Sequence, residues 1–225
     1  MTMLELIAIH IPKTAGKSFV AILRSIYGEE NVFWSGRDDT GKVLLEFEKA
    51  GLENMPKVLS GHFSFRQVSR IYRSANVPLV TWLRDPIERV ISDYFFFIMR
   101  IQSGLNRKNV HRWNETLLEF ACLPECRNRM SKFLDGIKLK EVFFFGLAEH
   151  FDEDFQEMRR RMGWPAVEPV YINSNRDFRS QFSPIPPENI EQLKKWNKED
   201  IELYREACSL RNARCGQVFT TSSPK

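Results

Sequence analysis

The amino-acid sequence predicts a three-layer α/β fold, in which helices cover both faces of a mainly parallel β-sheet. Three observations support this fold class. Short, β-branched apolar runs alternate along the chain with segments of helical apolar spacing. Gly and Pro mark several of the boundaries between these segments. Polar residues follow several of the apolar runs, and an open parallel sheet gathers such residues at one edge.

The first part of the chain contains four predicted strands, each followed by a predicted helix. The first three pairs are the strand at 4–10 with the helix at 18–24, the strand at 31–34 with the helix at 40–50, and the strand at 57–61 with the helix at 63–72. The fourth strand, 77–83, has the strongest signal and ends at Arg84. Asp85 then suits an N-cap, Pro86 the first helical position and Glu88 the third, so a helix is predicted to begin there.

The second part of the chain is predicted to add one strand and several helices. The helices are expected at 114–121, 125–134, 151–162 and 188–207, and the strand at 141–147. The segment 167–179 is predicted to be irregular and polar. With 225 residues, 43% of them hydrophobic, the chain can bury a sizeable core, and we interpret residues 1–225 as a single domain.

Composition limits the expected partners and the compartment. The net charge of +4 suits an anionic ligand, but no dense basic tract is present, so we expect no nucleic-acid partner. No apolar stretch approaches the ~20 residues of a membrane span, and the N-terminus lacks a signal-peptide pattern, so we expect no membrane partner and a cytoplasmic protein. The four cysteines are expected to be reduced structural thiols. One or two disulfides, and a lumenal catalytic domain cut from its anchor, are the alternatives.

The stretch at 11–19, IPKTAGKSF, predicts an anion-binding loop between the first strand and the first helix. Helix N–H groups, the helix dipole, two ammonium groups and two hydroxyls can face one phosphate there. The residues concerned are Pro12, Lys13, Thr14, Ala15, Gly16, Lys17, Ser18 and Phe19. The second half of the loop also matches the nucleotide-hydrolysing pattern G-x-x-x-x-G-K-[ST], although its first Gly would fall at Ile11. An ordinary strand-to-helix turn with solvent-facing lysines is the plain alternative.

Two segments resemble those of sulfotransferases that use 3′-phosphoadenosine-5′-phosphosulfate (PAPS), particularly the branch that includes heparan sulfate 2-O-sulfotransferase. IPKTAGKSF resembles the 5′-phosphosulfate loop, where P-K-T is followed by a turn that ends in S-F. LRDPIERVISDYF resembles the 3′-phosphate segment, which implies 3′-phosphate contacts from Arg84 and Ser92. The alternative is that Arg84 pairs with a neighbouring acid and Ser92 faces solvent. Lys17 departs from the family, in which a small hydroxyl-bearing residue is common.

The resemblance covers about 4–207 and implies a P-loop-NTPase-like sulfotransferase fold. It also implies PAPS as the cofactor and adenosine 3′,5′-bisphosphate (PAP) as its product. We expect no metal, because Lys13, the loop N–H groups and Ser18 can stabilise the leaving oxygen of a sulfuryl transfer. One alternative is a small-molecule kinase that uses Lys17 and Ser18, with Asp85 on Mg²⁺. Another is a non-catalytic nucleotide- or glycan-binding module.

His62 is the candidate general base. It follows a predicted strand, and the segment 61–65, G-H-F-S-F, is similar to the G-H-x-S-[FY] segment in which glycan 2-O-sulfotransferases carry a general base. The resemblance therefore implies that His62 takes the acceptor's proton, while Lys13 serves the leaving group. A structural histidine is the plain alternative, and His10 is the fallback base.

The acceptor is expected to be a hydroxyl-bearing carbohydrate. Arg66, Arg70 and Arg73 share one face of the helix after His62. We predict that Arg66 and Arg70 bind an anionic saccharide, the alternative being a solvated basic face. By resemblance, a polar loop lies over the nucleotide, so contacts from Asn175 and Arg176 are expected. The acceptor's identity and the oligomeric state stay open.

Overall fold

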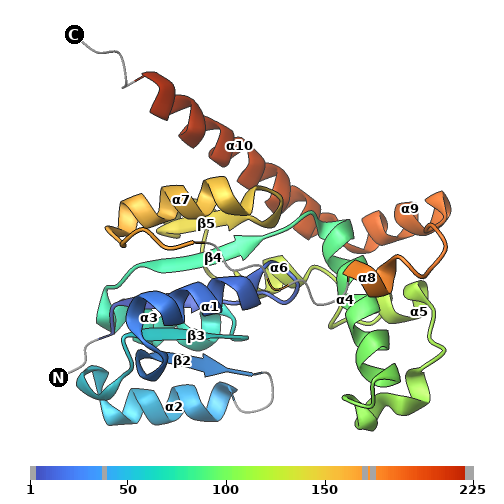
Figure 1. Ribbon diagram of the computed structural model, residues 1–225, viewed down its shortest axis with the longest axis horizontal. Helices are drawn as coiled ribbons and strands as arrows, with labels where there is room; N and C mark the ends of the chain where they lie inside the picture. The colour runs from blue at the N-terminus through green and yellow to red at the C-terminus, as the bar shows by residue number, and fades with distance from the viewer. Residues whose placement is uncertain (1–3, 37–39, 169–171, 173–175, 221–225) are drawn as a thin grey trace.

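The computed structural model describes residues 4–36, 40–168, 172 and 176–220. Within these ranges, five parallel strands form one sheet in the order β2-β3-β1-β4-β5 (Figure 1). The strands are β1 (Leu6–Ile9), β2 (Val32–Ser35), β3 (Val58–Gly61), β4 (Leu79–Leu83) and β5 (Phe144–Leu147). The predicted parallel α/β fold is therefore confirmed, and each predicted strand is present.

Helices connect and flank these strands. They are α1 (Gly16–Tyr27), α2 (Thr40–Ala50), α3 (Phe65–Ala75), α4 (Pro86–Gln102), α5 (Leu117–Ala121), α6 (Arg129–Phe133), α7 (Phe151–Met162), α8 (Arg176–Arg179), α9 (Pro187–Trp196) and α10 (Lys198–Thr220). Short 3₁₀ turns occur at Glu29–Asn31, Leu52–Asn54, Arg107–Arg112, Leu139–Glu141 and Ala148–His150.

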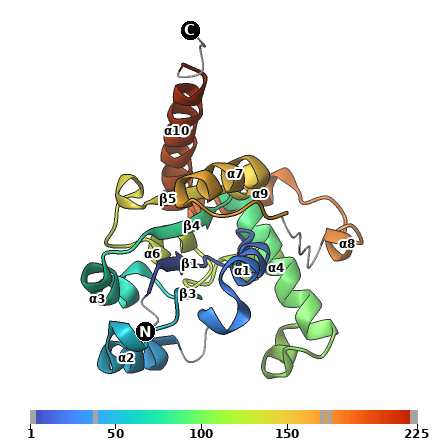
Figure 2. The same cartoon turned by 60° about the vertical axis from the view of Figure 1, so that its left-hand side comes forward.

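The central strand β1 sends alternate side chains to opposite faces of the sheet, as strand geometry requires. Leu6 and Ala8 join an apolar cluster with residues of α1 and α7. Ile7 and Ile9 join a second cluster with residues of α2, α3, α6 and α10. These two cores, one on each face, make the three layers that Figures 1 and 2 show from two sides.

Helix α4 begins where the sequence predicts. The carboxylate of Asp85 accepts hydrogen bonds from the backbone N–H groups of Ile87 (3.0 Å) and Glu88 (2.9 Å), and Pro86 is the first helical residue. With α5, α8 and α9, this helix lies beyond the carboxyl ends of the strands, at the right of Figure 1. It therefore forms a wall beside the edge where ligands of parallel sheets bind.

The predicted helix at 188–207 is two helices, because Asn197 interrupts it. Asn197 is fully buried, with φ −121° and ψ 35°. Its side-chain amide donates to the carbonyl of Leu193 (2.9 Å), and its amide oxygen accepts from the backbone N–H of Asn128 (3.0 Å). A buried polar side chain needs hydrogen-bond partners. One partner of Asn197 lies on a distant segment of the chain, and this long-range bond places the helix break at Asn197.

Two shorter helices and one helical turn also differ from the prediction. The helix predicted at 114–121 begins at Leu117, where Thr116 caps it, and the helix predicted at 125–134 begins at Arg129. Within the segment predicted to be irregular, the structure has the short helix α8. These are boundary differences, which leave the sheet and its edge unchanged.

Candidate active site

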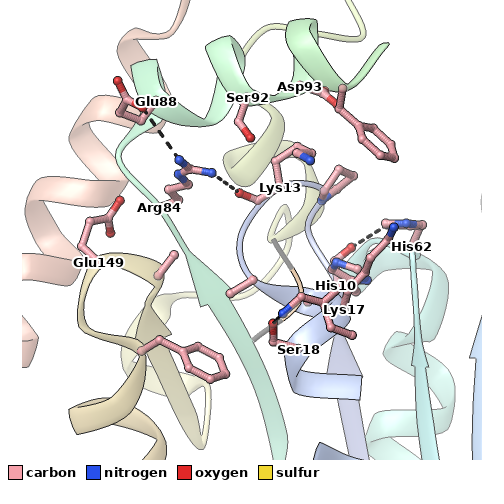
Figure 3. A pocket seen from close by; sticks show the side chains of 17 residues that line it. His10, Lys13, Lys17, Ser18, His62, Arg84, Glu88, Ser92, Asp93 and Glu149 are labelled. Carbon is pink, nitrogen blue, oxygen red and sulfur yellow. Dashed lines mark hydrogen bonds and ion pairs between the residues drawn. The ribbon is translucent and has the colours of Figure 1, made fainter. Parts of the chain in front are cut away.

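Three strand ends converge on one cavity at the carboxyl edge of the sheet. The register pairs Ile9 of β1 with Gly61 of β3 and with Thr81 of β4, so the residues that follow these strands start side by side. A cavity of about 520 Å³ opens there, a volume typical of small-molecule sites. Its lining includes His10, Pro12, Lys13, Ala15, Gly16, Lys17, Ser18, His62, Arg84 and Ser92 (Figure 3).

The loop between β1 and α1 has an unusual backbone. Lys13 and Ala15 take positive φ angles of 71° and 66°, in the region that non-glycine residues rarely adopt. Each such residue costs about 1–2 kcal/mol, so the surrounding packing must hold the loop in place. Ala15 is the N-cap of α1 and has no side-chain acceptor. The first N–H groups of α1 therefore have no side-chain cap and can serve an anion.

Two of the predicted loop ligands are turned away from the cavity. Thr14 is fully buried, and its hydroxyl donates to the carbonyl of Ile11 (2.8 Å), which closes the turn. Phe19 is buried in the core and packs edge-on against Trp82, with ring centroids 5.7 Å apart. Phe19 follows Ser18 by one position, so it points roughly 100° away from it around the helix. Thr14 and Phe19 therefore support the loop instead of lining the cavity.

The loop brings two ammonium groups and a hydroxyl to the cavity. The Nζ atoms of Lys13 and Lys17 lie 4.1 Å and 5.3 Å from the ring centroid of Phe96 on α4, within cation–π range. The hydroxyl of Ser18 accepts a hydrogen bond from the backbone N–H of Ile172 (3.0 Å). One wall of the cavity is thus strongly basic, which suits an anionic ligand.

Arg84, the residue after β4, and Ser92 of α4 face the same cavity (Figure 3). Nη1 of Arg84 donates to the carbonyl of Lys13 (3.2 Å), which ties the arginine to the loop. Glu88 lies 3.8 Å from Nη2 of Arg84, but Arg179 already binds this carboxylate through two hydrogen bonds of 2.6 Å and 3.2 Å. These bonds hold the pKa of Glu88 below its ordinary value. Glu88 is thus shared between the two arginines, and Arg179 holds it more closely than Arg84 does.

His62 is held in a defined orientation by the backbone of the preceding loop. Its Nδ1 lies 2.9 Å from the carbonyl oxygen of His10. A carbonyl oxygen can only accept, so Nδ1 carries the proton and Nε2 carries the lone pair of the neutral ring. This is the tautomer that a base acting through Nε2 requires.

The acidic residues of the cavity are each bound by a neighbour. Asp93 pairs with Arg129 (2.5 Å) and with Arg89 (3.6 Å). Burial lowers the pKa of the fully buried Arg89, and the negative charge of Asp93 opposes that shift. Glu149 accepts a hydrogen bond from the hydroxyl of Tyr204 (3.0 Å), and burial together with the Glu149 charge raises the pKa of Tyr204. The carboxylates of the cavity are thus engaged by their neighbours, which lessens their repulsion of an anionic ligand.

The basic face of α3 lies outside the cavity lining, so its contacts favour the alternative of a solvated basic face, and the roles of Arg66 and Arg70 as acceptor ligands stay predictions. Arg66 makes two hydrogen bonds to Asp135 (2.5 Å and 3.2 Å), and Nη1 of Arg70 lies 3.8 Å from Glu48. Both arginine side chains are mostly exposed, at 71% and 84%. Arg66 and Arg70 of this face are thus each paired with an acidic side chain, Asp135 and Glu48 respectively.

The predicted nucleotide loop is described only in part. Asn175 lies outside the described residues. Arg176 is the first residue of α8, and the structure describes its backbone but not its side chain. The expected contacts of Asn175 and Arg176 with a nucleotide therefore stay predictions.

The sequence prediction omits several residues that line the cavity. Glu88 and Phe96 stand four positions before and after Ser92 on α4, and i, i+4 spacing places all three on one helix face. That spacing was the available signal. Glu149 and Phe151 follow β5, and the sequence analysis assigns no site residue to this segment. Their role depends on β5 lying beside β4 in the sheet.

Three further observations concern the described part of the chain. No helix in it is both long and apolar enough to cross a membrane. The same residues contain no group of three or more His, Cys, Asp and Glu side chains that could hold a metal ion. All four cysteines, which lie within this part, are free thiols.

Comparison with known proteins gives a family match and two structural likenesses. The family model described as "Sulfotransferase family" matches residues 3–205. The chain is similar in structure to mouse sulfotransferase SULT7A1 complexed with PAP, with 13% identity, a TM-score of 0.48, and coverage of 73% of this chain and 60% of that chain. It is also similar to a sulfotransferase from Alicyclobacillus acidocaldarius, with 13% identity, a TM-score of 0.48, and coverage of 90% and 94%. No curated protein matches.

Proposed function

We propose that this chain, which belongs to the sulfotransferase family, moves a sulfuryl group from PAPS to a hydroxyl group of a carbohydrate acceptor. Sulfuryl transfer is the reaction class of the family. The single observation that carries the proposal is the meeting of the 12–18 loop, Arg84, Ser92 and His62 at one cavity. The carbohydrate acceptor rests on the resemblance of the segment 61–65 to glycan 2-O-sulfotransferases.

The donor set of the cavity fits a nucleotide with two separate phosphate groups. Lys13, Lys17 and the first N–H groups of α1 form one anion-binding cluster, and Arg84 with Ser92 forms the other. When bound, PAPS supplies the activated sulfuryl group and a 5′-phosphate leaving group. The first cluster would hold the phosphosulfate end, and the second would hold the 3′-phosphate.

His62 performs the proton transfer in this proposal. Its Nε2 takes the proton of the acceptor hydroxyl while that oxygen bonds to sulfur, and the bond from sulfur to the 5′-phosphate oxygen breaks. The electron pair of the broken bond stays on that phosphate oxygen, whose growing charge Lys13 and the loop N–H groups stabilise. Arg84, tied to the carbonyl of Lys13 at 3.2 Å, keeps the two anion clusters in register.

A calorimetric titration with PAP, and separately with ATP–Mg²⁺, tests the cofactor. We expect PAP to bind tightly without magnesium and ATP–Mg²⁺ to give no heat of binding. Binding of ATP–Mg²⁺ alone would replace the proposal with a P-loop kinase. Turnover of PAPS with a panel of saccharides then tests the acceptor, and binding of PAP without turnover of any hydroxyl compound would favour a non-catalytic binding module.

A further inference from the structure

His10 stands beside the proposed base because of the register of the sheet. Ile9 of β1 pairs with Gly61 of β3, so the next residues, His10 and His62, lie abreast. Neighbouring strands are ~4.8 Å apart, which is a stacking distance for flat rings. The two imidazole rings indeed stack, with centroids 4.5 Å apart and planes 27° apart, and Figure 3 shows them side by side.

A third ring completes this packing. Trp34 of β2 lies 4.7 Å from His10 and 5.3 Å from His62, centroid to centroid, with its plane at 70° to that of His62. The His62 ring therefore has His10 against one face, Trp34 at its side, and its Nδ1 on the His10 carbonyl. These contacts leave the ring few orientations other than the observed one.

The other side of His10 lies against the anion-binding loop. A Cβ atom added at Gly16, the first residue of α1, would fall 1.8 Å from both Cδ2 and Nε2 of His10. Only a glycine permits this approach. His10 therefore contacts the proposed base on one side and the backbone of the loop on the other, while remaining only 8% exposed.

We propose that His10 is a positioning residue, whose ring sets the distance and angle between the His62 base and the loop that holds the leaving group. The inference rests on the proposed function. In-line transfer needs both groups in place at once, and a displacement of about 1 Å can cost 10²-fold in rate. One rigid ring that contacts both groups supplies this alignment. In this role His10 needs a flat ring, and it transfers no proton.

Two substitutions at His10 separate positioning from proton transfer. His10→Ala should lower kcat by about 10- to 10²-fold, with PAP affinity within about threefold of the native value. His10→Phe keeps a flat ring without a titratable nitrogen and should restore kcat to within about fivefold of native. His111→Ala, at an exposed histidine outside the cavity, is the control and should change nothing. Native kcat in His10→Ala would overturn the inference. So would a folded, PAP-binding His10→Phe that is as slow as His10→Ala.

A double-mutant cycle tests the contact with the loop and remains informative if His10→Phe fails to fold. Gly16→Ala alone should slow turnover about tenfold, because the new Cβ displaces the His10 ring. In His10→Ala the space is vacated, so the double variant should be no slower than His10→Ala. Losses that multiply would overturn the inference.

The tautomer of His62 gives a readout that does not depend on activity. In native protein, ¹⁵N NMR should show His62 with its proton on Nδ1, hydrogen-bonded to the backbone carbonyl of residue 10. His10→Ala keeps this carbonyl but removes the stacked ring, so the His62 ring should turn away from the carbonyl for part of the time and give a mixture of both tautomers. An unchanged tautomer together with unchanged kcat overturns the positioning role. Failure of the proposed function would instead appear in the native protein, as a lack of PAP binding or of sulfuryl transfer.

Discussion

Two basic regions of this molecule differ in what surrounds their charges. The cavity cations are Lys13, Lys17 and Arg84, and the basic face of α3 consists of Arg66, Arg70 and Arg73. Arg66 is bound by both oxygens of Asp135, and this pairing lowers the pKa of Asp135. Arg84 forms an ion pair with Glu88 at 3.8 Å, but Arg179 binds the same carboxylate through two shorter hydrogen bonds. The comparison teaches that an arginine is more available to bind a ligand when the acid beside it is already hydrogen-bonded to another arginine.

The largest expected effect is at the proposed base. His62→Ala should lower turnover by about 10²- to 10⁴-fold, because a positioned general base typically contributes that much. PAP affinity should stay near the native value, since His62 acts on the acceptor. Steady-state kinetics and calorimetry check the two parts. Near-native turnover would show that His62 is a structural residue, and the cavity would then lack its proposed general base.

Arg84→Ala should have the next largest effect. PAP affinity should fall about 10²-fold, because charge-assisted bonds to phosphate are among the strong ones. Affinity for adenosine 5′-phosphosulfate, which lacks the 3′-phosphate, should barely change. Calorimetric titrations with both nucleotides measure the difference. Equal loss for both would assign Arg84 to the fold and not to the 3′-phosphate.

Arg179→Ala sharpens the comparison directly. Glu88 already forms a 3.8 Å ion pair with Arg84, and without Arg179 it can approach Arg84 more closely, so PAP affinity should fall about tenfold. The double variant Arg179→Ala with Glu88→Gln removes the competing acid and should regain most of the native affinity. Calorimetry again reports the result. If the double variant binds as weakly as Arg179→Ala, then Arg179 contacts the nucleotide itself.

The same ion pair predicts a modest dependence of stability on pH. Glu88 has a folded pKa below its ordinary value of 4.5, so its bond to Arg179 stabilises the fold fully above pH 4.5 and is lost as the pH falls through the lowered value. Because Glu88 is 42% exposed, the effect should stay below about 1 kcal/mol. Urea unfolding of native protein and Glu88→Gln should therefore differ at pH 6, and the difference should shrink as the pH falls below 4.5. Arg179→Gln should give the same pattern, and a difference that grows in acid would contradict it.

The smallest effect is expected on α3. Arg66→Ala should change the acceptor KM and PAP affinity by less than about twofold, because an exposed pair outside the cavity contributes little. The same holds for Arg70→Ala. An acceptor KM that rises several-fold in either variant, and that also rises with salt, would instead support the predicted contacts of this face with an anionic acceptor.

Several features of the site could be predicted because they depend on neighbours in the sequence. The cap at Asp85 and the turn after β1 follow from residues within one helical turn. The i, i+4 spacing around Ser92 was equally local and pointed to Phe96. By contrast, Asn197 interrupts the last predicted helix through a hydrogen bond to Asn128, 69 residues earlier in the chain. A sequence pattern that spans only a few residues cannot reveal such a contact.

The sequence alone therefore determined the parallel α/β class, the basic loop between β1 and α1, and the strand ends that carry polar residues. Periodicity, capping and turn chemistry act over a few residues, and they can be recognised without a fold. Only the tertiary structure decided which charges remain available and which rings touch. The stacking of His10 on His62 depends on the pairing of β1 with β3, and the availability of Arg84 depends on Arg179, 91 residues after Glu88. Such contacts follow from long-range packing, where the same residue types can meet in many ways.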